Sequence, residues 1–243
     1  MKQVIVYNQI DTSYHGASRY QNDDLFNYFK AQIDWSLSLG WKKTDIIIGT
    51  NFDFSYNGIT NYHLYDICKY SGFNNFWYGA HELLSADINN NIFEGEDFWL
   101  HDQDSWPVRY FDFPTFEGEV AGCEYQGTNQ WNCGSIYCKN SSKYVLEYIV
   151  KLMKDNPDLD ISSDEVLIGW CRFDNRSQIS DLMKSINTRY NVGVTHFQKR
   201  FDFAEKPINV FSFKPDKDSD YKVVEKYLPK EMKNIFIKYN MRS

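Results

Sequence analysis

The sequence predicts an α/β fold in which a mostly parallel central sheet is flanked by helices. Short apolar runs rich in β-branched residues alternate with longer segments whose apolar residues recur every three or four positions. The clearest strands are 4–7 and 45–50, and the run 98–100 has the continuous apolar character of a strand buried on both faces. Alternation of this kind favours parallel strands joined by right-handed crossovers.

In the first part of the chain, a polar loop follows strand 4–7. A helix is then expected from near Asn22 to Gly40, with an apolar face made by Phe26, Phe29, Ile33 and Leu37. After strand 45–50, the pattern predicts a short helix at 62–70, a third strand at 76–78, a helix at 81–88 and the fourth strand at 98–100.

From Phe111 onward the pattern is less regular. Strands are predicted at 119–123, 190–197 and 210–213, and a polar loop at 127–134 runs into 135–138. Helices are expected near Ser142, at 164–170 and around 179–186, and an amphipathic segment at 222–239. No repeat, low-complexity tract or linker divides the 243 residues, so one domain spanning 1–243 is predicted.

The net charge and the aromatic content limit the kinds of molecule that the protein is expected to bind. The net charge of −7 disfavours non-specific binding to nucleic acid, which requires a basic face. Aromatic residues make up 18% of the chain, more than a core of this size usually needs. Rings offer flat platforms for sugars and nucleobases, although most individual rings serve in the core.

The cysteines and the apolar runs predict where the protein resides. There are five cysteines, an odd number without a regular framework, which favours free thiols in a reducing compartment. The first apolar run is too short for a signal peptide, and no window reaches transmembrane length. A soluble cytoplasmic protein without a membrane span is therefore expected.

An acidic pair follows the apolar run 98–100. Residues i and i+2 of an extended segment point the same way, so Asp102 and Asp104 can converge at the exit of the strand. Oxygen ligands of this kind suit Mg²⁺ or Mn²⁺ carrying a diphosphate, and open α/β sheets bind ligands at such strand ends. An isolated pair of this kind is more often a solvated acidic turn.

Four segments, taken in order, resemble the metal-dependent, nucleotide-sugar glycosyltransferases of the GT-A fold. Their order is most similar to the glycogenin and bacterial galactosyltransferase type, and they are 98–104, 131–137, 163–168 and 195–197 with Lys206-Pro207 downstream. The chain departs from that pattern at Glu165, where the family has Gln. The segment between His196 and Lys206 is longer and lacks the family's glycine.

The resemblance implies a Rossmann-like GT-A domain with two halves and a tail. Residues 1–110 would bind the nucleotide sugar, 111–215 would form the acceptor and catalytic half, and 216–243 would be a helical tail. It implies transfer of a sugar, hexosyl or pentosyl, from a UDP-sugar donor to a glycan or another hydroxyl acceptor with Mn²⁺ or Mg²⁺ as cofactor. That metal would neutralise the leaving diphosphate as a Lewis acid.

The resemblance also implies roles for individual residues. The metal ligands would be Asp102, Asp104 and His196, although a lone histidine in an apolar strand often simply packs. Asp102 and Gln103 would contact the donor, and Asn132 would lie beside its sugar unless it is a turn residue. Catalytic or sugar-binding carboxylates would be Asp164 and Glu165, which could equally complement a helix dipole. The nucleobase end of the donor would meet Tyr7, Asn8, Gln9 and Asp11.

Stereochemistry and the rival functions stay open at this point. Retaining transfer follows from the motif order, whereas inverting transfer would require a general base such as Glu124, Asp164 or Glu165. Trp106, Trp131 and Tyr125 are candidates for the acceptor groove. The rivals are a non-catalytic protein of the same fold that binds sugars or nucleotide sugars, and a metal-dependent phosphohydrolase. In the latter class, the acidic pair usually ends the first strand instead of the fourth.

Overall fold

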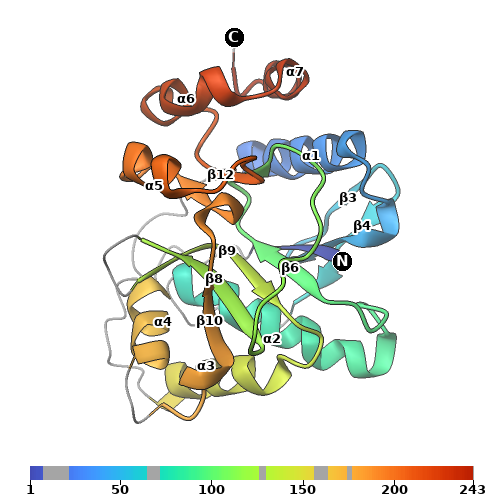
Figure 1. The fold of residues 1–243 in the computed structure, drawn as a ribbon. Helices are drawn as coiled ribbons and strands as arrows, with labels where there is room; N and C mark the ends of the chain where they lie inside the picture. Colours follow the sequence, from blue (N-terminus) through green and yellow to red (C-terminus); the bar gives the residue numbers. More distant parts are fainter. Residues whose placement is uncertain (8–21, 65–71, 126–129, 156–163, 174–176, 243) are drawn as a thin grey trace.

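A seven-stranded sheet forms the centre of the protein in a computed structural model, which describes residues 1–7, 22–64, 72–125, 130–155, 164–173 and 177–242 (Figure 1). The strand order is β10-β8-β9-β6-β1-β2-β5. The strands are β1 (Lys2–Tyr7), β2 (Ile46–Thr50), β5 (Tyr62–His63), β6 (Phe98–His101), β8 (Val120–Glu124), β9 (Trp131–Cys138) and β10 (Met183–Ile186).

The sheet is mostly parallel, which confirms the predicted fold class. β1 runs parallel to both β2 and β6, β2 runs parallel to β5, and β10 runs parallel to β8. β9 is the exception, because it runs antiparallel to both β6 and β8. Its amino end therefore lies at the same edge of the sheet as the carboxyl ends of the parallel strands.

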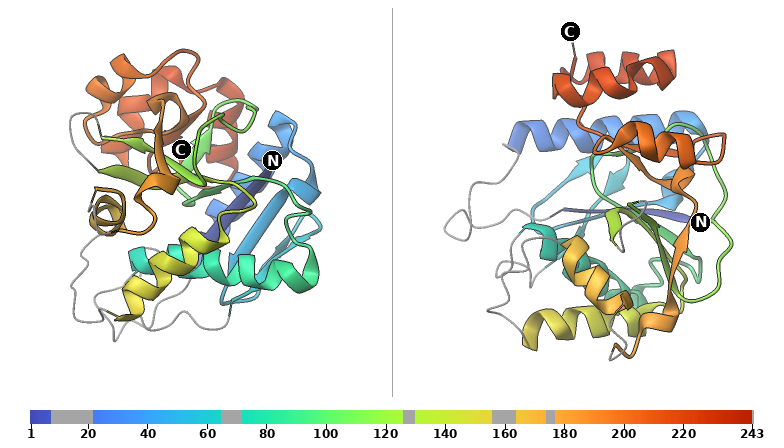
Figure 2. Two further views of the ribbon diagram at one scale, coloured as in Figure 1. Left: turned by 60° about the horizontal axis from the view of Figure 1, so that its bottom comes forward. Right: turned by 60° about the vertical axis from the view of Figure 1, so that its left-hand side comes forward.

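Helices cover both faces of this sheet (Figure 2). Three of them, α2 (Gly72–Asn90), α3 (Lys143–Asp155) and α4 (Asp164–Phe173), pack on one face, and α1 (Asn22–Leu39) packs on the other. Successive side chains of a strand point to opposite faces of the sheet, which explains why the two helix layers contact different residues of the same strand. Val4 and Leu100 point to the first face, whereas Ile5 and Trp99 point to the second.

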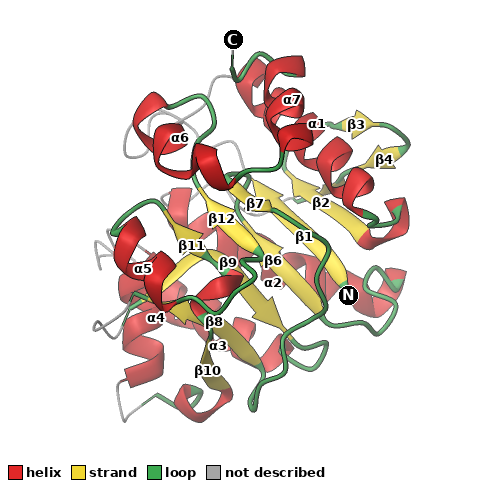
Figure 3. Cartoon of the chain, turned by 45° about the horizontal axis from the view of Figure 1, so that its top comes forward, coloured by secondary structure: helices red, strands yellow, loops and turns green. Residues whose placement is uncertain are grey.

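A second, three-stranded sheet carries the C-terminal part of the chain (Figure 3). Its order is β11-β12-β7, and β12 pairs antiparallel with β7. The strands are β7 (Ser105–Pro107), β11 (Val192–Gly193) and β12 (Val210–Ser212), and the helices beside them are α5 (Phe197–Phe203), α6 (Asp218–Val224) and α7 (Lys230–Lys238). A hairpin, β3 (Ser55–Tyr56) with β4 (Ile59–Thr60), and four 3₁₀ turns complete the described elements: η1 (Lys43–Asp45), η2 (Ser180–Leu182), η3 (Thr188–Tyr190) and η4 (Glu225–Tyr227).

The C-terminal helix α7 is attached to the rest of the protein by a partly buried carboxylate. Asp34 on α1 accepts hydrogen bonds from Lys238 Nζ (2.6 Å), Tyr239 Oη (2.6 Å) and Tyr56 Oη. Burial alone would raise the pKa of Asp34, but these donors outweigh it and hold the pKa below its usual value. The contact joins α7 to α1 and to the β3–β4 hairpin.

Five sequence-based predictions of secondary structure are wrong. Residues 131–134, predicted as part of a polar loop, begin the strand β9. Residues 76–78 lie inside α2, where Trp77, Ala80 and Leu84 form a helical apolar face on the sheet. Tyr62–His63 is a strand instead of the start of a helix, and 65–71 lie outside the described residues. Residues 179–186 form η2 and the edge strand β10 instead of a helix, and 190–197 contain only the short strand β11 before α5 begins. In each case pairing or packing with a distant segment overrides a local pattern.

Within the described ranges, no helix has both the length and the apolar composition needed to cross a membrane.

The four described cysteines are free and buried: Cys123, Cys133, Cys138 and Cys171. Burial raises the pKa of Cys171 to about 12, and it raises the pKa values of Cys123 and Cys138 as well. We expect iodoacetamide at about pH 8 to leave these four thiols unmodified in the native protein and to alkylate all of them in urea. Peptide mass spectrometry measures this, and equal alkylation rates of Cys171 in the native and unfolded protein would contradict the packing described here.

Candidate active site

The acidic pair leaves the middle strand of the sheet, as predicted. β6 is the fourth of seven strands, and Trp99 and Leu100 are fully buried within it. The backbone then turns, because Ser105 N–H donates to the carbonyl of Asp102 (3.1 Å), and β7 starts at Ser105. Asp102 and Asp104 are both partly exposed on this turn between the two sheets.

Each backbone carbonyl from residue 102 to residue 105 has a hydrogen-bond donor. Gln32 Nε2 on α1 donates to the carbonyls of Gln103 and Ser105, both at 2.9 Å. Phe213 N–H, directly after β12, donates to the carbonyl of Asp104 (2.9 Å). Two separate elements, α1 and the segment after β12, therefore hold the backbone of the acidic turn, and this fixes the positions of the Asp102 and Asp104 Cα atoms.

His101 supplies a further contact from beneath the turn. Its ring is fully buried, stacks on Trp99 with 3.9 Å between ring centroids, and lies 2.8 Å from the carbonyl of Asp102 through Nδ1. Burial lowers the pKa of His101 to about 3, so the ring is neutral near neutral pH. Because a carbonyl can only accept, Nδ1 carries the proton and Nε2 accepts from Gln3 Nε2 at 3.0 Å.

Asn132 lies next to the acidic pair. Asp102 N–H donates to the carbonyl of Gly134 (3.1 Å), and Gly134 N–H donates to Asn132 Oδ1 (3.1 Å). The antiparallel β9 makes this possible, because its amino end lies beside the carboxyl end of β6. The structure thus brings together two of the predicted site residues, Asp102 and Asn132.

The Asn132 backbone is held from the second sheet. Asn191, which is almost fully buried, donates through Nδ2 to the carbonyl of Asn132 (3.2 Å). Gly193 permits the close approach, since a Cβ atom there would lie 2.6 Å from Asn132 Nδ2, nearer than side chains pack. Ser212 Oγ lies 2.6 Å from Asn191 Oδ1 and 2.8 Å from Ser105 Oγ, which links this support to the acidic turn.

The structure shows one residue that the motif comparison missed, Lys214. It follows Phe213, whose N–H bonds the Asp104 carbonyl, so a half-buried lysine lies one residue from the acidic turn. Lys206, in the other Lys-Pro pair of the chain, instead directs its Nζ to the backbone carbonyls of Phe201 and Ala204. The signal was present in the sequence, because Lys214-Pro215 directly follows the predicted strand 210–213.

His196 occupies the N-cap of α5 rather than a strand. Its backbone is left-handed (φ 54°) and its side chain is exposed. Among the described residues, no group of three His, Cys, Asp or Glu side chains lies close enough together to hold a metal ion. The role of His196 as a third ligand therefore stays a prediction.

The remaining predicted site residues are half-buried, outside the described part of the structure, or fully buried. Tyr7 ends β1 opposite Thr50 and is half-buried. Asn8, Gln9 and Asp11 lie outside the described residues, and so do the side chains of Asp164 and Glu165, although both residues begin α4 as expected. Trp106 and Trp131 are fully buried, so they cannot line an acceptor groove, because a fully buried ring has no surface left for a ligand.

Glu124 has partners that limit its use as a general base. Its carboxylate forms an ion pair with Arg172 and accepts a hydrogen bond from Ser185 Oγ (2.5 Å). These two contacts occupy the Glu124 carboxylate at the carboxyl end of β8.

Neither a protein-family model nor a curated protein sequence matches the chain. Solved structures do match it, and they include three glycosyltransferases, each at low sequence identity. A glycosyltransferase involved in the glycosylation of the major capsid of PBCV-1 has a TM-score of 0.54 and 8% identity, over 87% of this chain and 93% of that one. The galactosyltransferase LgtC, in complex with donor and acceptor sugar analogues, has a TM-score of 0.54 and 11% identity, over 97% and 100%. Apo GlyE from Streptococcus pneumoniae TIGR4 has a TM-score of 0.57 and 10% identity, over 100% and 65%. The chain therefore has the GT-A fold of these glycosyltransferases.

Proposed function

We propose that the protein is a glycosyltransferase that moves a sugar from a nucleoside-diphosphate sugar, UDP-linked in our prediction, to a hydroxyl group of a glycan or another acceptor. The observation that carries the proposal is the acidic turn. Two aspartates leave the central strand on a backbone held at every carbonyl, beside Asn132 and next to Lys214. This arrangement occurs in a fold shared with glycosyltransferases.

The donor set of the turn fits a divalent cation. Mg²⁺ and Mn²⁺ in phosphate-binding sites use one or two carboxylates and complete their coordination with phosphate and water oxygens. Asp102 and Asp104 would supply the carboxylates, with His196 as a third ligand. Such an ion, when bound, neutralises charge that builds up on the leaving diphosphate.

The protein's own residues would then bind and orient the substrates. Lys214 would add a second positive charge next to the diphosphate, and Gln103 would contact the donor. Asn132 would face the donor sugar, and Tyr7, Asn8, Gln9 and Asp11, at and after the end of β1, would receive the nucleobase. Asp164 and Glu165 would bind sugar hydroxyls or act as catalytic carboxylates, with retaining transfer favoured.

A thermal-shift and product-release screen tests the proposal. We expect UDP with Mn²⁺ to raise the melting temperature by about 5–10 °C at a hundredfold excess over its Kd, because ligand binding to the folded state alone stabilises it by about 2.7 kcal/mol. Incubation with a panel of UDP-sugars and Mn²⁺ should release UDP, and EDTA should prevent both effects. Binding without release would indicate a non-catalytic binder, and a shift that is the same with EDTA would contradict the metal site.

A further inference from the structure

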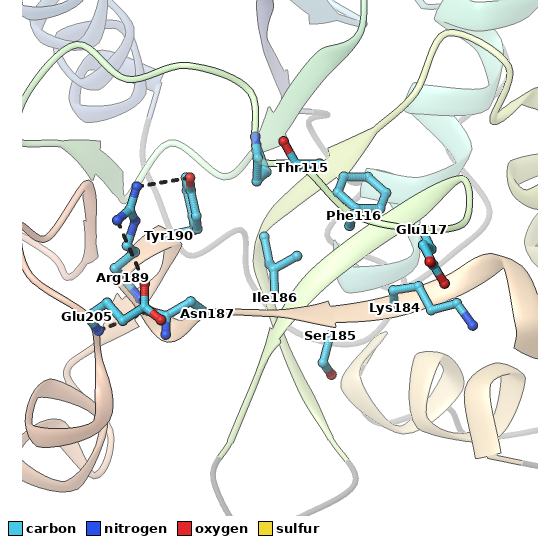
Figure 4. A pocket seen from close by; sticks show the side chains of 11 residues that line it. Thr115, Phe116, Glu117, Lys184, Ser185, Ile186, Asn187, Arg189, Tyr190 and Glu205 are labelled. Carbon is cyan, nitrogen blue, oxygen red and sulfur yellow. Dashed lines mark hydrogen bonds and ion pairs between the residues drawn. The ribbon is translucent and has the colours of Figure 1, made fainter.

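A groove of about 570 Å³ lies at the edge of the central sheet, and no residue of the acidic turn lines it (Figure 4). Its floor is the edge strand β10 with Asn187 after it, and its walls are residues 114–117 on one side and Arg189, Tyr190 and Glu205 on the other. Its volume is typical of small-molecule sites, which range over about 300–1,000 Å³.

Two partly exposed rings line the groove and are held in place from behind. Tyr190 packs edge-on against Tyr137, with 5.4 Å between ring centroids, and its carbonyl accepts a hydrogen bond from Tyr137 Oη (3.0 Å). Phe116, on the opposite wall, packs against Phe113 at 5.6 Å. Rigid rings of this kind offer binding area at a low cost in conformational entropy.

Polar groups on both walls face the same space. Asn187 Oδ1 accepts from the backbone N–H groups of Arg189 (2.9 Å) and Glu205 (3.0 Å), which orients the amide and leaves its NH₂ group as the donor. Arg189 Nη2 donates to Tyr190 Oη (3.2 Å), and Arg189 Nη1 lies 3.9 Å from the Glu205 carboxylate. Thr115 and Glu117 lie across the groove (Figure 4).

The charges of the lining restrict what the groove can bind. Lys184 and Arg189 are balanced by Glu117 and Glu205, so the lining is neutral overall. A phosphate or nucleic acid would meet the two carboxylates without an excess of cations, and a lipid would leave the charged groups without solvent. A neutral ligand with many hydroxyl groups fits, because it can donate to the carboxylates, accept from the cations and lie against the rings.

The groove is also joined to the proposed active site through adjacent residues. Asn191 follows Tyr190 in the chain and donates to the carbonyl of Asn132, which lies beside Asp102. Ser185, which is also on the floor, donates to Glu124 at the carboxyl end of β8. Residues that line the groove are therefore adjacent to residues that support the proposed active site.

We propose that the groove is a carbohydrate-binding site that holds a neutral oligosaccharide, namely a part of the acceptor glycan distant from the hydroxyl that receives the new sugar. The assignment of the ligand as acceptor rests on the function proposed above, whereas carbohydrate binding by the groove does not require a donor or a metal.

Binding of free oligosaccharides tests the proposal. The probes are lactose, maltotetraose, cellotetraose and N,N′-diacetylchitobiose, measured by saturation-transfer difference NMR and calorimetry without donor or metal. We expect at least one of them to bind the wild-type protein. Phe116→Ala should weaken that binding about threefold to tenfold, the contribution of one ring contact. Thr115→Tyr, which fills the groove from an exposed position, should weaken it about tenfold or more.

A matched control is Phe203→Ala, which removes a phenylalanine that is 57% exposed on α5 and does not line the groove. It should leave binding unchanged. The proposal is overturned if no probe binds, if Phe203→Ala weakens binding as much as Phe116→Ala, or if a strand-forming Val- and Thr-rich peptide binds β10 in preference to every saccharide. Saccharide binding in the groove without metal-dependent UDP binding would refute the glycosyltransferase function and leave the groove assignment standing. Metal-dependent UDP binding without saccharide binding would refute the groove assignment alone.

Discussion

Asp104→Asn is expected to reduce the affinity for Mn²⁺–UDP and the rate of UDP release by at least about 100-fold. The substitution removes a negative charge from the proposed metal site, and a metal that stabilises transferred charge contributes several kcal/mol. The fold should persist, because the acidic turn is held through the carbonyl of Asp104, which the variant retains. Calorimetry with Mn²⁺ and UDP, together with a UDP-release assay, measures both effects.

Asp112→Asn is the matched control for this variant. Asp112 is an exposed carboxylate eight residues further along the chain, outside the acidic turn. It should change neither the affinity nor the rate, and both variants should melt within about 2 °C of the wild type because both positions are at the surface. If UDP binding and release depend on Mn²⁺ in Asp104→Asn as they do in the wild type, the assignment of the acidic turn as the metal site is wrong.

Gln32→Met is expected to lower the melting temperature by about 5–15 °C and to weaken Mn²⁺–UDP binding about tenfold. Methionine matches the length of glutamine but has no N–H, so the buried carbonyls of Gln103 and Ser105 would each lose a hydrogen bond. Each carbonyl left without a partner costs about 1–3 kcal/mol, which gives the expected drop in melting temperature. The weaker binding follows because the released turn would have to be ordered again when the ligand binds.

Hydrogen exchange separates this positioning role from a general loss of stability. In Gln32→Met, the amide of Ser105 should exchange faster than in the wild type under conditions where amides of β1 keep their protection. Ser36→Ala is the control, since Ser36 is equally buried on the same helix and its Oγ has no hydrogen-bond partner among the described residues. A variant that melts lower but binds Mn²⁺–UDP with unchanged affinity would show that Gln32 supports the fold and not the site.

The preferred catalytic carboxylates also depend on the tertiary structure. From the sequence, Glu124, Asp164 and Glu165 were equivalent candidates for a general base in inverting transfer. The carboxylate of Glu124 is already held by Arg172 and Ser185, so it is less available to contact a substrate hydroxyl. Asp164 and Glu165, at the start of α4, thus stay the better candidates.

Much of the fold could be predicted from local patterns. The runs 4–7 and 45–50 and the apolar face ending at Gly40 identify β1, β2 and α1, and Gly40 has the left-handed backbone (φ 108°) that a helix end favours. The apolar run 98–100 indicated a strand buried on both faces, and β6 is that strand. These features can be predicted locally, because the spacing of apolar residues and the β-branched content within one segment indicate its secondary structure and its buried face.

Other features depend on contacts between residues far apart in the sequence. Trp77 lies on a helix and Met183 in a strand because α2 packs on the sheet and β10 pairs with β8, and neither event is visible in a short window. Phe213 and Gln32 bond the acidic turn from 109 and 71 residues away, respectively, counted from Asp104 and Gln103. The sequence by itself determined β1, β2, β6 and the acidic pair after β6, because these are local properties of the chain. Only the tertiary structure decided which side chains support that pair and where a groove forms, because both depend on how distant segments pack.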